Sequence, residues 1–201
     1  SCTKKSFPRA SNSKSFRSID ENNKEMSRFD ELLISCKKQN PQAMMEMYDI
    51  CAKPVYNASL HIVMNEFDAE EIMQDSILKA FDNIGKFLGT EKEFVAFVKR
   101  IAINKSIDWF RKNRKTPFFT EVGNEAEDIS DDDEEQIFSF EMVKEKIDSL
   151  PAGYRMVINL HLIDELGFEE IAEIMNVKPS TVRSQYFRAK EKLRKELAVN
   201  S

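Results

Sequence analysis

Basic and aromatic side chains gather in one short stretch of the chain, INKSIDWFRKNRK at residues 103–115. Its cations are Lys105, Arg111, Lys112, Arg114 and Lys115. Cations neutralise phosphates and aromatic rings stack on unpaired bases, so Trp109 and Phe110 in this setting favour a nucleic-acid strand whose bases are unstacked. An equally simple interpretation stays open, in which the rings belong to a core and the cations cover a solvated helix end.

A second basic stretch, near the C-terminus, has the pattern of a helix-turn-helix. Apolar spacing predicts a short amphipathic helix over 168–175, followed by a tight turn at 176–179 and a long basic helix over 180–197. We expect Val182 and Phe187 to hold the basic helix inward. The outer face is then left to Ser180, Thr181, Arg183, Ser184 and Arg188. Such a helix fits the major groove of duplex DNA, although a solvated basic helix in an ordinary bundle would carry the same charges.

An acidic face lies between Asn65 and Ser76, where the chain has no Lys or Arg. Its carboxylates are Glu66, Asp68, Glu70, Glu71 and Asp75. These groups would repel DNA. Favourable charge at a helix N-terminus and a docking surface for another protein explain them about equally well.

Several function classes lack the residues they need. Neither His61 nor His161 follows a Glu by three positions, which disfavours a helical metalloenzyme. No phosphate-binding loop and no nucleophile–base pair is evident, so we expect no enzyme, no cofactor and no metal. Cys2, Cys36 and Cys51 form an odd set without a CxxC pair, which fits a reducing, cytoplasmic location. No apolar run is long enough for a membrane span, and no secretory signal is expected at the start of the chain.

The elements that position these residues are helical. Five Gly and six Pro in 201 residues are few for a β protein, so we predict an all-α chain. Its net charge of −5 is unevenly distributed, because residues 116–138 carry nine acidic and no basic side chains. We therefore expect two small helical domains, over 28–115 and 139–198, joined by an acidic flexible linker at 116–138. Residues 1–27 are poor in apolar side chains and are expected to be a disordered extension.

Helix signals divide the first domain further. Asn40-Pro41 is typical of a helix start, and Pro54 within the following apolar pattern predicts a kink or a break into two helices. Asp68 with Glu71 has the spacing of a capping box and predicts a helix ending before Gly85. The last helix of the domain is expected from about residue 92 to 112. Its buried stripe should be Phe94, Phe97, Val98, Ile101 and Ile107.

Two blocks of the sequence, in the same order, resemble the extracytoplasmic-function sigma factors of bacterial RNA polymerase. FDAEEIMQDSILKAFDNIGKF with FVAFVKRIAINKSIDWFRKNRK is similar to their region 2, and LPAGYRMVINLHLIDELGFEEIAEIMNVKPSTVRSQYFRAKEKLR to their region 4. The resemblance spans roughly residues 28–197 and implies a sigma factor that directs promoter recognition and initiation. Its implied partners are core polymerase (the clamp of the largest subunit and the flap), promoter DNA and an anti-sigma factor, and it implies no membrane segment in the chain.

The resemblance also implies roles for individual residues. In the helix from 68 to 84, Glu71, Gln74 and Asp75 would contact the polymerase clamp. The loop at 86–93 would help to capture and melt the minus-ten element. The helix side chains given the same role are Asn104, Lys105, Asp108, Arg111 and Lys112. For the minus-thirty-five element, read as duplex DNA, the matching positions are Lys178, Ser180, Thr181, Arg183, Ser184, Phe187, Arg188 and His161.

Some positions depart from the family pattern. Gln185 stands where many relatives carry a basic residue, Lys178 where a small residue or Pro is usual, and His161 where an Arg often touches phosphate. These departures bear on the exact minus-thirty-five sequence. With a net charge of −5 and two small basic patches, the chain alone should bind duplex weakly, and polymerase would fix the two patches at the promoter spacing.

Two alternatives are kept. An ordinary transcription regulator with a C-terminal helix-turn-helix would bind a palindrome without polymerase, as a dimer. The nine carboxylates of the linker have three possible roles. They would mimic nucleic acid in the basic channel of polymerase, bind the basic patches of the two domains in the free chain, or serve only as a soluble spacer. Replacing all nine with Ser or Asn separates these linker hypotheses, through core affinity, free promoter binding and abortive RNA.

Overall fold

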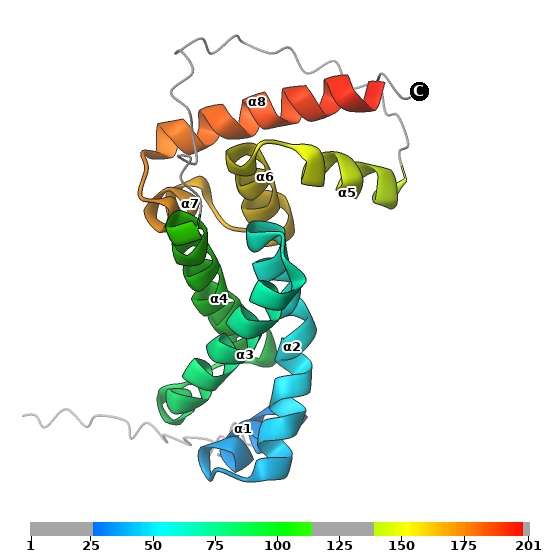
Figure 1. Ribbon diagram of the computed structural model, residues 1–201. Helices are drawn as coiled ribbons and strands as arrows, with labels where there is room; N and C mark the ends of the chain where they lie inside the picture. The colour runs from blue at the N-terminus through cyan, green and yellow to red at the C-terminus, as the bar shows by residue number, and fades with distance from the viewer. Residues whose placement is uncertain (1–25, 114–138, 199–201) are drawn as a thin grey trace, which may run out of the picture.

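The computed structural model describes residues 26–113 and 139–198, and within them only helices and their connections occur (Figure 1). The prediction of an all-α fold is confirmed. The N-terminal bundle consists of α1 (Arg28–Lys37), α2 (Pro41–Val63), α3 (Glu66–Asp82), the short helix η1 (Ile84–Lys86) and α4 (Glu91–Asn113). The C-terminal bundle consists of α5 (Phe140–Ser149), α6 (Ala152–Ile158), η2 (Asn159–Ile163), α7 (Phe168–Met175) and α8 (Pro179–Ala198). The acidic linker and residues 1–25 of the predicted N-terminal extension lie outside the described residues. At the end of that extension Ser27 is ordered, because it forms a capping box with Asp30 at the start of α1.

Helix α2 is the central element of the N-terminal bundle. Its start is as predicted, because the Asn40 side chain accepts from the backbone N–H of Ala43 at 3.1 Å. The expected break at Pro54 does not occur, and the helix runs on to Val63. Pro54 cannot donate a backbone hydrogen bond, but Cys51 and Val55 on either side of it are fully buried against α3 and α4. This packing offsets the loss and keeps the helix continuous.

The predicted capping box of α3 is wrong. The N-cap is Asn65, whose side chain accepts from the backbone N–H of Asp68 at 3.0 Å, so Asp68 is the third helical residue. The predicted stop at Gly85 is also displaced. Helix α3 ends at Asp82, where Asn83 donates to the carbonyl of Lys79, and no left-handed glycine is needed.

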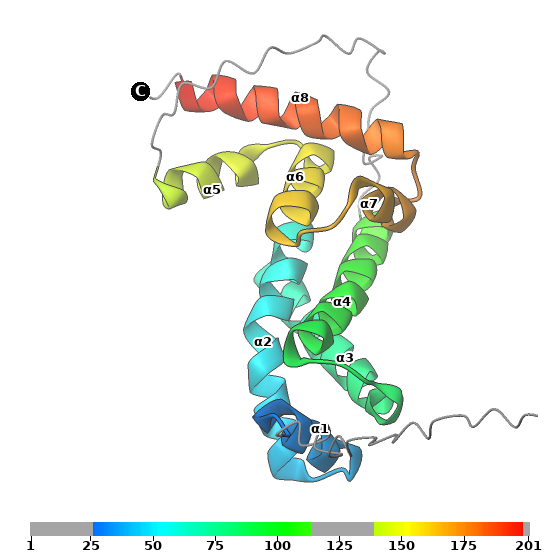
Figure 2. The same ribbon diagram turned by 180° about the vertical axis from the view of Figure 1, so that it is seen from behind.

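The C-terminal bundle contains the helix-turn-helix as predicted. Asn176 ends α7 in the left-handed conformation with φ of 51°, and Val177 donates its N–H back to the carbonyl of Ala172. Helix α8 then lies across α5 and α6, as both views show (Figures 1 and 2). Leu150, Ile158 and Ala189 form the small core beneath it.

The two bundles pack against each other, which the sequence did not predict. The upper ends of α2 and α4 meet α6 and α7 in both views (Figure 2). One apolar cluster crosses this junction and joins, from the N-terminal bundle, Ala58, Ile62, Ile103, Ile107 and Phe110 to, from the C-terminal bundle, Met156, Val157, Leu160, Ile171, Ala172, Met175 and Val182. Among the described helices, none is long and apolar enough to cross a membrane.

Candidate nucleic-acid interface

The helix-turn-helix presents the predicted side chains on its outer face. Buried Ile171, Met175 and Val182 hold α7 and α8 together. Of the predicted minus-thirty-five residues, Lys178, Ser180, Arg183, Ser184 and Phe187 are exposed, and His161, Thr181 and Arg188 are half-buried. This row covers the first three turns of α8, which is the part of a recognition helix that reaches base edges.

Phe187 does not hold α8 inward, as its spacing had predicted. Its side chain is 51% exposed, while Tyr186 packs toward the core instead. An apolar ring therefore lies among the positions expected to face DNA, where it could contact a thymine methyl group. Gln185, which stands where the resemblance implies a basic residue, is buried. We therefore do not expect it to contact DNA.

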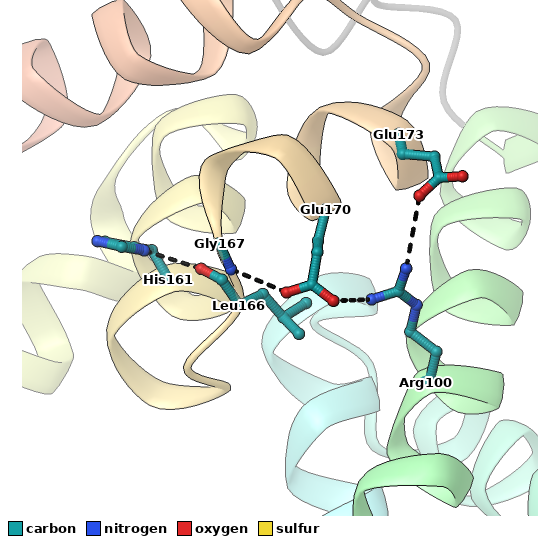
Figure 3. A network of polar contacts seen from close by, with 6 residues as sticks. All are labelled: Arg100, His161, Leu166, Gly167, Glu170 and Glu173. Atoms are coloured by element: carbon teal, nitrogen blue, oxygen red, sulfur yellow. Dashed lines mark hydrogen bonds and ion pairs between the residues drawn. The ribbon is translucent and has the colours of Figure 1, made fainter.

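His161 is part of an aromatic stack that joins η2 to the helix-turn-helix. Its Nδ1 lies 2.9 Å from the carbonyl oxygen of Leu166, and since a carbonyl only accepts, Nδ1 carries the proton (Figure 3). The ring stacks on Phe168 at a centroid distance of 4.3 Å and meets the edge of Tyr186 at 4.9 Å. A phosphate oxygen also accepts, so it could bind Nε2 only in the imidazolium form, in which both ring nitrogens donate.

Arg183 is held in place by α7. It donates to Glu169 at 2.7 Å, and its guanidinium lies 6.0 Å from the centre of the Phe168 ring. An Arg aligned in this way loses little side-chain freedom when it contacts a base. The first helix of the motif thus pre-positions a side chain of the second.

The second candidate surface lies along the last three turns of α4. Asn104, Asp108, Arg111 and Lys112 are exposed, and Lys105 is half-buried. Phe110 is buried and fits the interpretation as a core residue. Trp109 is only partly buried, so the interpretation as a ring that stacks on bases stays open for it. Arg114 and Lys115 lie outside the described residues.

Sequence reasoning missed a hollow beside the loop that precedes α4. Its volume is about 450 Å³, and it is lined by Lys79, Asn83, Lys86, Phe87, Phe97 and Ile101. Phe97, predicted to be buried, is 36% exposed and lies 6.1 Å from the Phe87 ring, at an interplanar angle of 31°. An exposed aromatic ring with lysines beside it can stack an unpaired base and attract its phosphate.

The loop beside this hollow is fixed from both sides. Lys37 of α1 donates to the carbonyl of Phe87 at 2.7 Å. At the start of α4, the backbone and hydroxyl of Thr90 donate to Glu93, and these hydrogen bonds lower the pKa of the Glu93 carboxyl. Gly89, at φ of +155°, allows the chain to turn between them. The hollow is therefore a formed feature of the fold.

The predicted polymerase contacts share one exposed face of α3. Glu71, Gln74 and Asp75 are all exposed, and Phe67 and Leu78, at 77% and 61% exposure, lie one turn before and after them. Apolar and acidic side chains in one row are typical of a protein-docking surface, which favours that explanation of the acidic face. The sequence carried a signal for this surface, because Phe67 and Leu78 are apolar but do not follow the helical spacing of the buried residues of α3.

Comparisons with known proteins agree with this arrangement. The family description of sigma-70 region 2 matches residues 47–116, and that of sigma-70 region 4 matches residues 140–193. The ECF RNA polymerase sigma factor SigW of Bacillus subtilis (strain 168) is 33% identical over 174 residues, which cover 80% of this chain and 92% of SigW. The chain belongs to the extracytoplasmic-function (ECF) sigma factors of bacterial RNA polymerase.

Two further similarities extend this result. The ECF RNA polymerase sigma-E factor of Escherichia coli (strain K12) is 32% identical over 137 residues, which cover 62% of this chain and 71% of that factor. A solved structure of CnrH in complex with the cytosolic domain of CnrY matches with a TM-score of 0.50 and 21% identity, covering 85% of this sigma factor and 97% of CnrH. That likeness supports the fold. Within the described residues, no group of His, Cys, Asp and Glu side chains suited to a metal ion occurs.

Proposed function

We propose that this sigma factor uses three separate surfaces in initiation: α3 to bind core polymerase, α4 with its hollow to open the minus-ten element, and α8 to read the minus-thirty-five element. The observation that carries the proposal is the presence, in one chain, of two exposed surfaces whose chemistry suits two different forms of DNA. An exposed recognition helix suits duplex DNA, while a hollow with aromatic walls suits an unpaired base. A dimeric regulator needs only the recognition helix.

The minus-ten assignment is supported by the order of groups along α3 and α4. Lys79 and Lys86 stand at the rim of the hollow, and the Asn104–Lys112 row continues from it along α4. A strand that stacked one base on the partly exposed Phe97 ring would pass over these polar side chains. Strand opening then follows from tighter binding of the extruded base than of the paired one, without nucleotide hydrolysis by this chain.

The minus-thirty-five assignment is supported by the exposed outer row of α8. Arg183, aligned by Glu169 and Phe168, is the side chain best placed to form a bidentate contact with guanine. Ser180, Ser184 and Phe187 flank it on the same face. His161 would contact a phosphate through Nε2 only as the imidazolium, which donates from both nitrogens. Lys178 and Arg188 would contribute charge.

The partners and location follow from the same proposal. Core polymerase would contact Glu71, Gln74 and Asp75 on α3 through its clamp, and the C-terminal bundle through its flap. CnrH, a protein of similar fold, was solved in complex with the cytosolic domain of CnrY. We propose that an anti-sigma factor binds this chain. The protein would act in the cytoplasm, without enzymatic activity, cofactor or metal.

Run-off transcription tests the proposal. Purified core polymerase is mixed with genomic fragments from the encoding organism, with and without the sigma factor. Promoter-specific transcripts that depend on both proteins are expected. Specific duplex binding by the chain alone, with no such transcript, would instead favour the dimeric regulator.

A further inference from the structure

The exposed face of α3 has a large apolar side chain near each end. Phe67, Glu71, Gln74 and Leu78 follow the spacing of one helix face and are all exposed, so they form a single row. Phe67 is 77% exposed and Leu78 is 61% exposed. Two large apolar side chains left in water on one helix face are typical of a surface that another segment contacts.

Helix α3 is also the most acidic helix that the structure describes. It carries six carboxylates against one lysine, a net charge of −5. The three glutamates of α7 are all paired with arginines, two of them with Arg100 (Figure 3). Of the α3 carboxylates, Asp75 alone has an ion pair within the described residues, with Lys105. The face of α3 therefore attracts a further cationic segment.

A segment of this kind is present in the chain itself, at residues 1–19. It has five cations and no acidic side chain, so its net charge of +5 is equal and opposite to that of α3. The sequence KSFPR at residues 5–9 is repeated as KSFR at residues 14–17. Each repeat thus places cations on both sides of a phenylalanine ring.

The two ends of the α3 face have the complementary chemistry. Phe67 lies one turn from Glu71. Leu78 lies within one turn of Asp75 and Asp82. Each end therefore combines an apolar side chain with carboxylates, and each repeat combines an apolar ring with cations. One repeat can bind at each end through apolar contact and opposite charge.

The lengths of the two partners agree. Leu78 follows Phe67 by 11 positions, which is about 16 Å along a helix. The nine positions from Phe7 to Phe16 reach about 30 Å when extended, so one segment can span both ends. The segment is longer than the face requires and does not have to be fully extended.

The attachment of the segment sets its direction. Eight residues separate the second repeat from Met26, a further reach of about 26 Å when extended. Helix α1, which follows Met26 and Ser27, contacts the C-terminal end of α3, where both helices line one hollow of about 600 Å³. The repeat nearer to α1 is therefore expected at Leu78, and the other repeat at Phe67.

We propose that residues 4–17 dock along the exposed face of α3 in the free chain, with Phe7 at Phe67 and Phe16 at Leu78. The cations of the segment then lie beside the carboxylates of α3. The docking depends only on the chemistry of the two partners, and no second protein takes part in it.

Docking has a consequence for polymerase, and this consequence rests on the proposed function. Glu71, Gln74 and Asp75, the proposed clamp contacts, lie on the face that the segment covers. The segment and core polymerase therefore compete for α3. Competition lowers the affinity of the chain for core polymerase by the factor that the docked state contributes.

A spin label on Cys2 detects the docked segment. Burial raises the pKa of Cys51 to about 12 and also raises that of Cys36, so these thiols react slowly and Cys2 is labelled. The label should broaden the amide NMR signals at the start of α3, and reduction of the label should restore them. Absence of broadening in α3, or broadening of α7 in its place, would overturn the proposal.

A mixture of two preparations tests whether the segment binds a second copy of the chain. Spin-labelled protein without ¹⁵N is mixed with ¹⁵N-labelled protein in which Cys2 is replaced by Ser. No broadening of α3 is expected, since the contact lies within one chain. Broadening in the mixture as strong as in the single preparation would assign the contact to a neighbouring molecule and contradict docking within the chain.

Substitutions on both partners identify the contact. Phe7→Ser with Phe16→Ser should remove the broadening, and so should replacement of the five cations by Ser. Phe67→Ser should remove it from the side of α3, and the exposure of Phe67 leaves the fold intact. Ser11→Ala in the segment and Leu162→Ser, at an exposed position of the C-terminal bundle, are the matched controls and should preserve it. Broadening that survives all the first substitutions would refute the contact.

Affinity for core polymerase separates this proposal from the proposed function. The variant without the five cations should bind core polymerase at least about fivefold more tightly than wild type, because a competing contact has been removed. If wild type does not bind core polymerase, the proposed function fails, and the NMR signals still decide the docking. If wild type binds and the variant binds equally well, the proposal is overturned and the proposed function stands.

Discussion

The ammonium group of Lys105 in α4 lies 3.1 Å from the carboxylate of Asp75 in α3. The resemblance to sigma factors assigns Lys105 to the minus-ten element and Asp75 to the polymerase clamp. The ion pair joins the two candidate surfaces, so a polymerase contact at Asp75 would change the partner of a cation proposed to face DNA. Both side chains are partly exposed, at 31% and 62%, and the pair therefore adds little to stability.

Replacing each partner should separate the two roles. Lys105→Met is expected to lower minus-ten opening about tenfold with unchanged core affinity, because it removes one charge-assisted contact. Asp75→Asn should weaken core binding instead. Either variant should change the free energy of unfolding by less than about 1 kcal/mol. Core binding, promoter opening and denaturant unfolding are measured on both, and loss of core affinity in K105M would contradict the assignment.

The hollow beside the loop can be tested with two phenylalanines of one helix. Phe97→Ala should impair promoter opening, and its cost in stability should stay near 1 kcal/mol because the ring is partly exposed. Phe94→Ala is the matched control, since Phe94 is fully buried and its loss should cost about 3–5 kcal/mol. The measurements are urea unfolding and opening of a promoter fragment. Normal opening by a folded F97A would refute the base-binding role.

The recognition helix should show a specific and a nonspecific effect. Arg183→Ala is expected to lose about 1–3 kcal/mol of preference for the native minus-thirty-five sequence over a scrambled one. Lys190→Ala, also exposed on α8, should weaken binding to both templates equally and reduce its salt dependence. Transcription from the two templates over a range of salt gives both quantities. Equal losses for R183A on native and scrambled elements would show that Arg183 does not read bases.

Stability should depend on pH through His61, which lies in α2 near the junction. Burial lowers its pKa below the ordinary value of 6.5, against the opposing effects of Asp164 and Asp148, while Lys144 and Lys99 lower it further. The unfolded state then binds the proton more readily than the folded state. Its contribution to stability is complete above pH 6.5 and declines as the pH falls toward the folded pKa.

The measurement is urea unfolding of wild type and His61→Gln between pH 5 and pH 8. Part of the decline below pH 6.5 should vanish in H61Q, because the titrating group has been removed. Identical pH profiles of the two proteins would show that His61 is not the group responsible.

Helix boundaries show where sequence reasoning succeeded and where it did not. Asn40-Pro41 and the turn at Asn176 were predicted correctly because the signal lies within a few adjacent residues. At α3, both Asn65 and Asp68 have side chains suited to capping, and the local sequence does not decide between them. Asn65→Ala should therefore cost about 1 kcal/mol and Asp68→Ala less than half of that, by thermal unfolding.

One candidate site could be predicted from the sequence and the other could not. The outer row of α8 could be predicted because it follows from the period of one helix. The hollow lined by Phe87 and Phe97 could not, since it depends on how α1, α3 and the loop meet. Phe97 and Phe187 both have the spacing of core residues, and tertiary packing leaves them exposed. Contacts between bundles, such as Arg100 with Glu170, join residues 70 positions apart and have no local signal.

Permanganate reactivity of thymines in the minus-ten element tests the central claim most directly, because it reports unpaired bases at the predicted position. With core polymerase and wild-type sigma factor, these thymines should become reactive, and neither protein alone should have this effect. Reactivity should fall with F97A and persist with Lys53→Asp, a change at an exposed position of α2 outside the hollow. Thymines that stay unreactive in the complete mixture, while the sigma factor alone protects duplex DNA, would contradict the account.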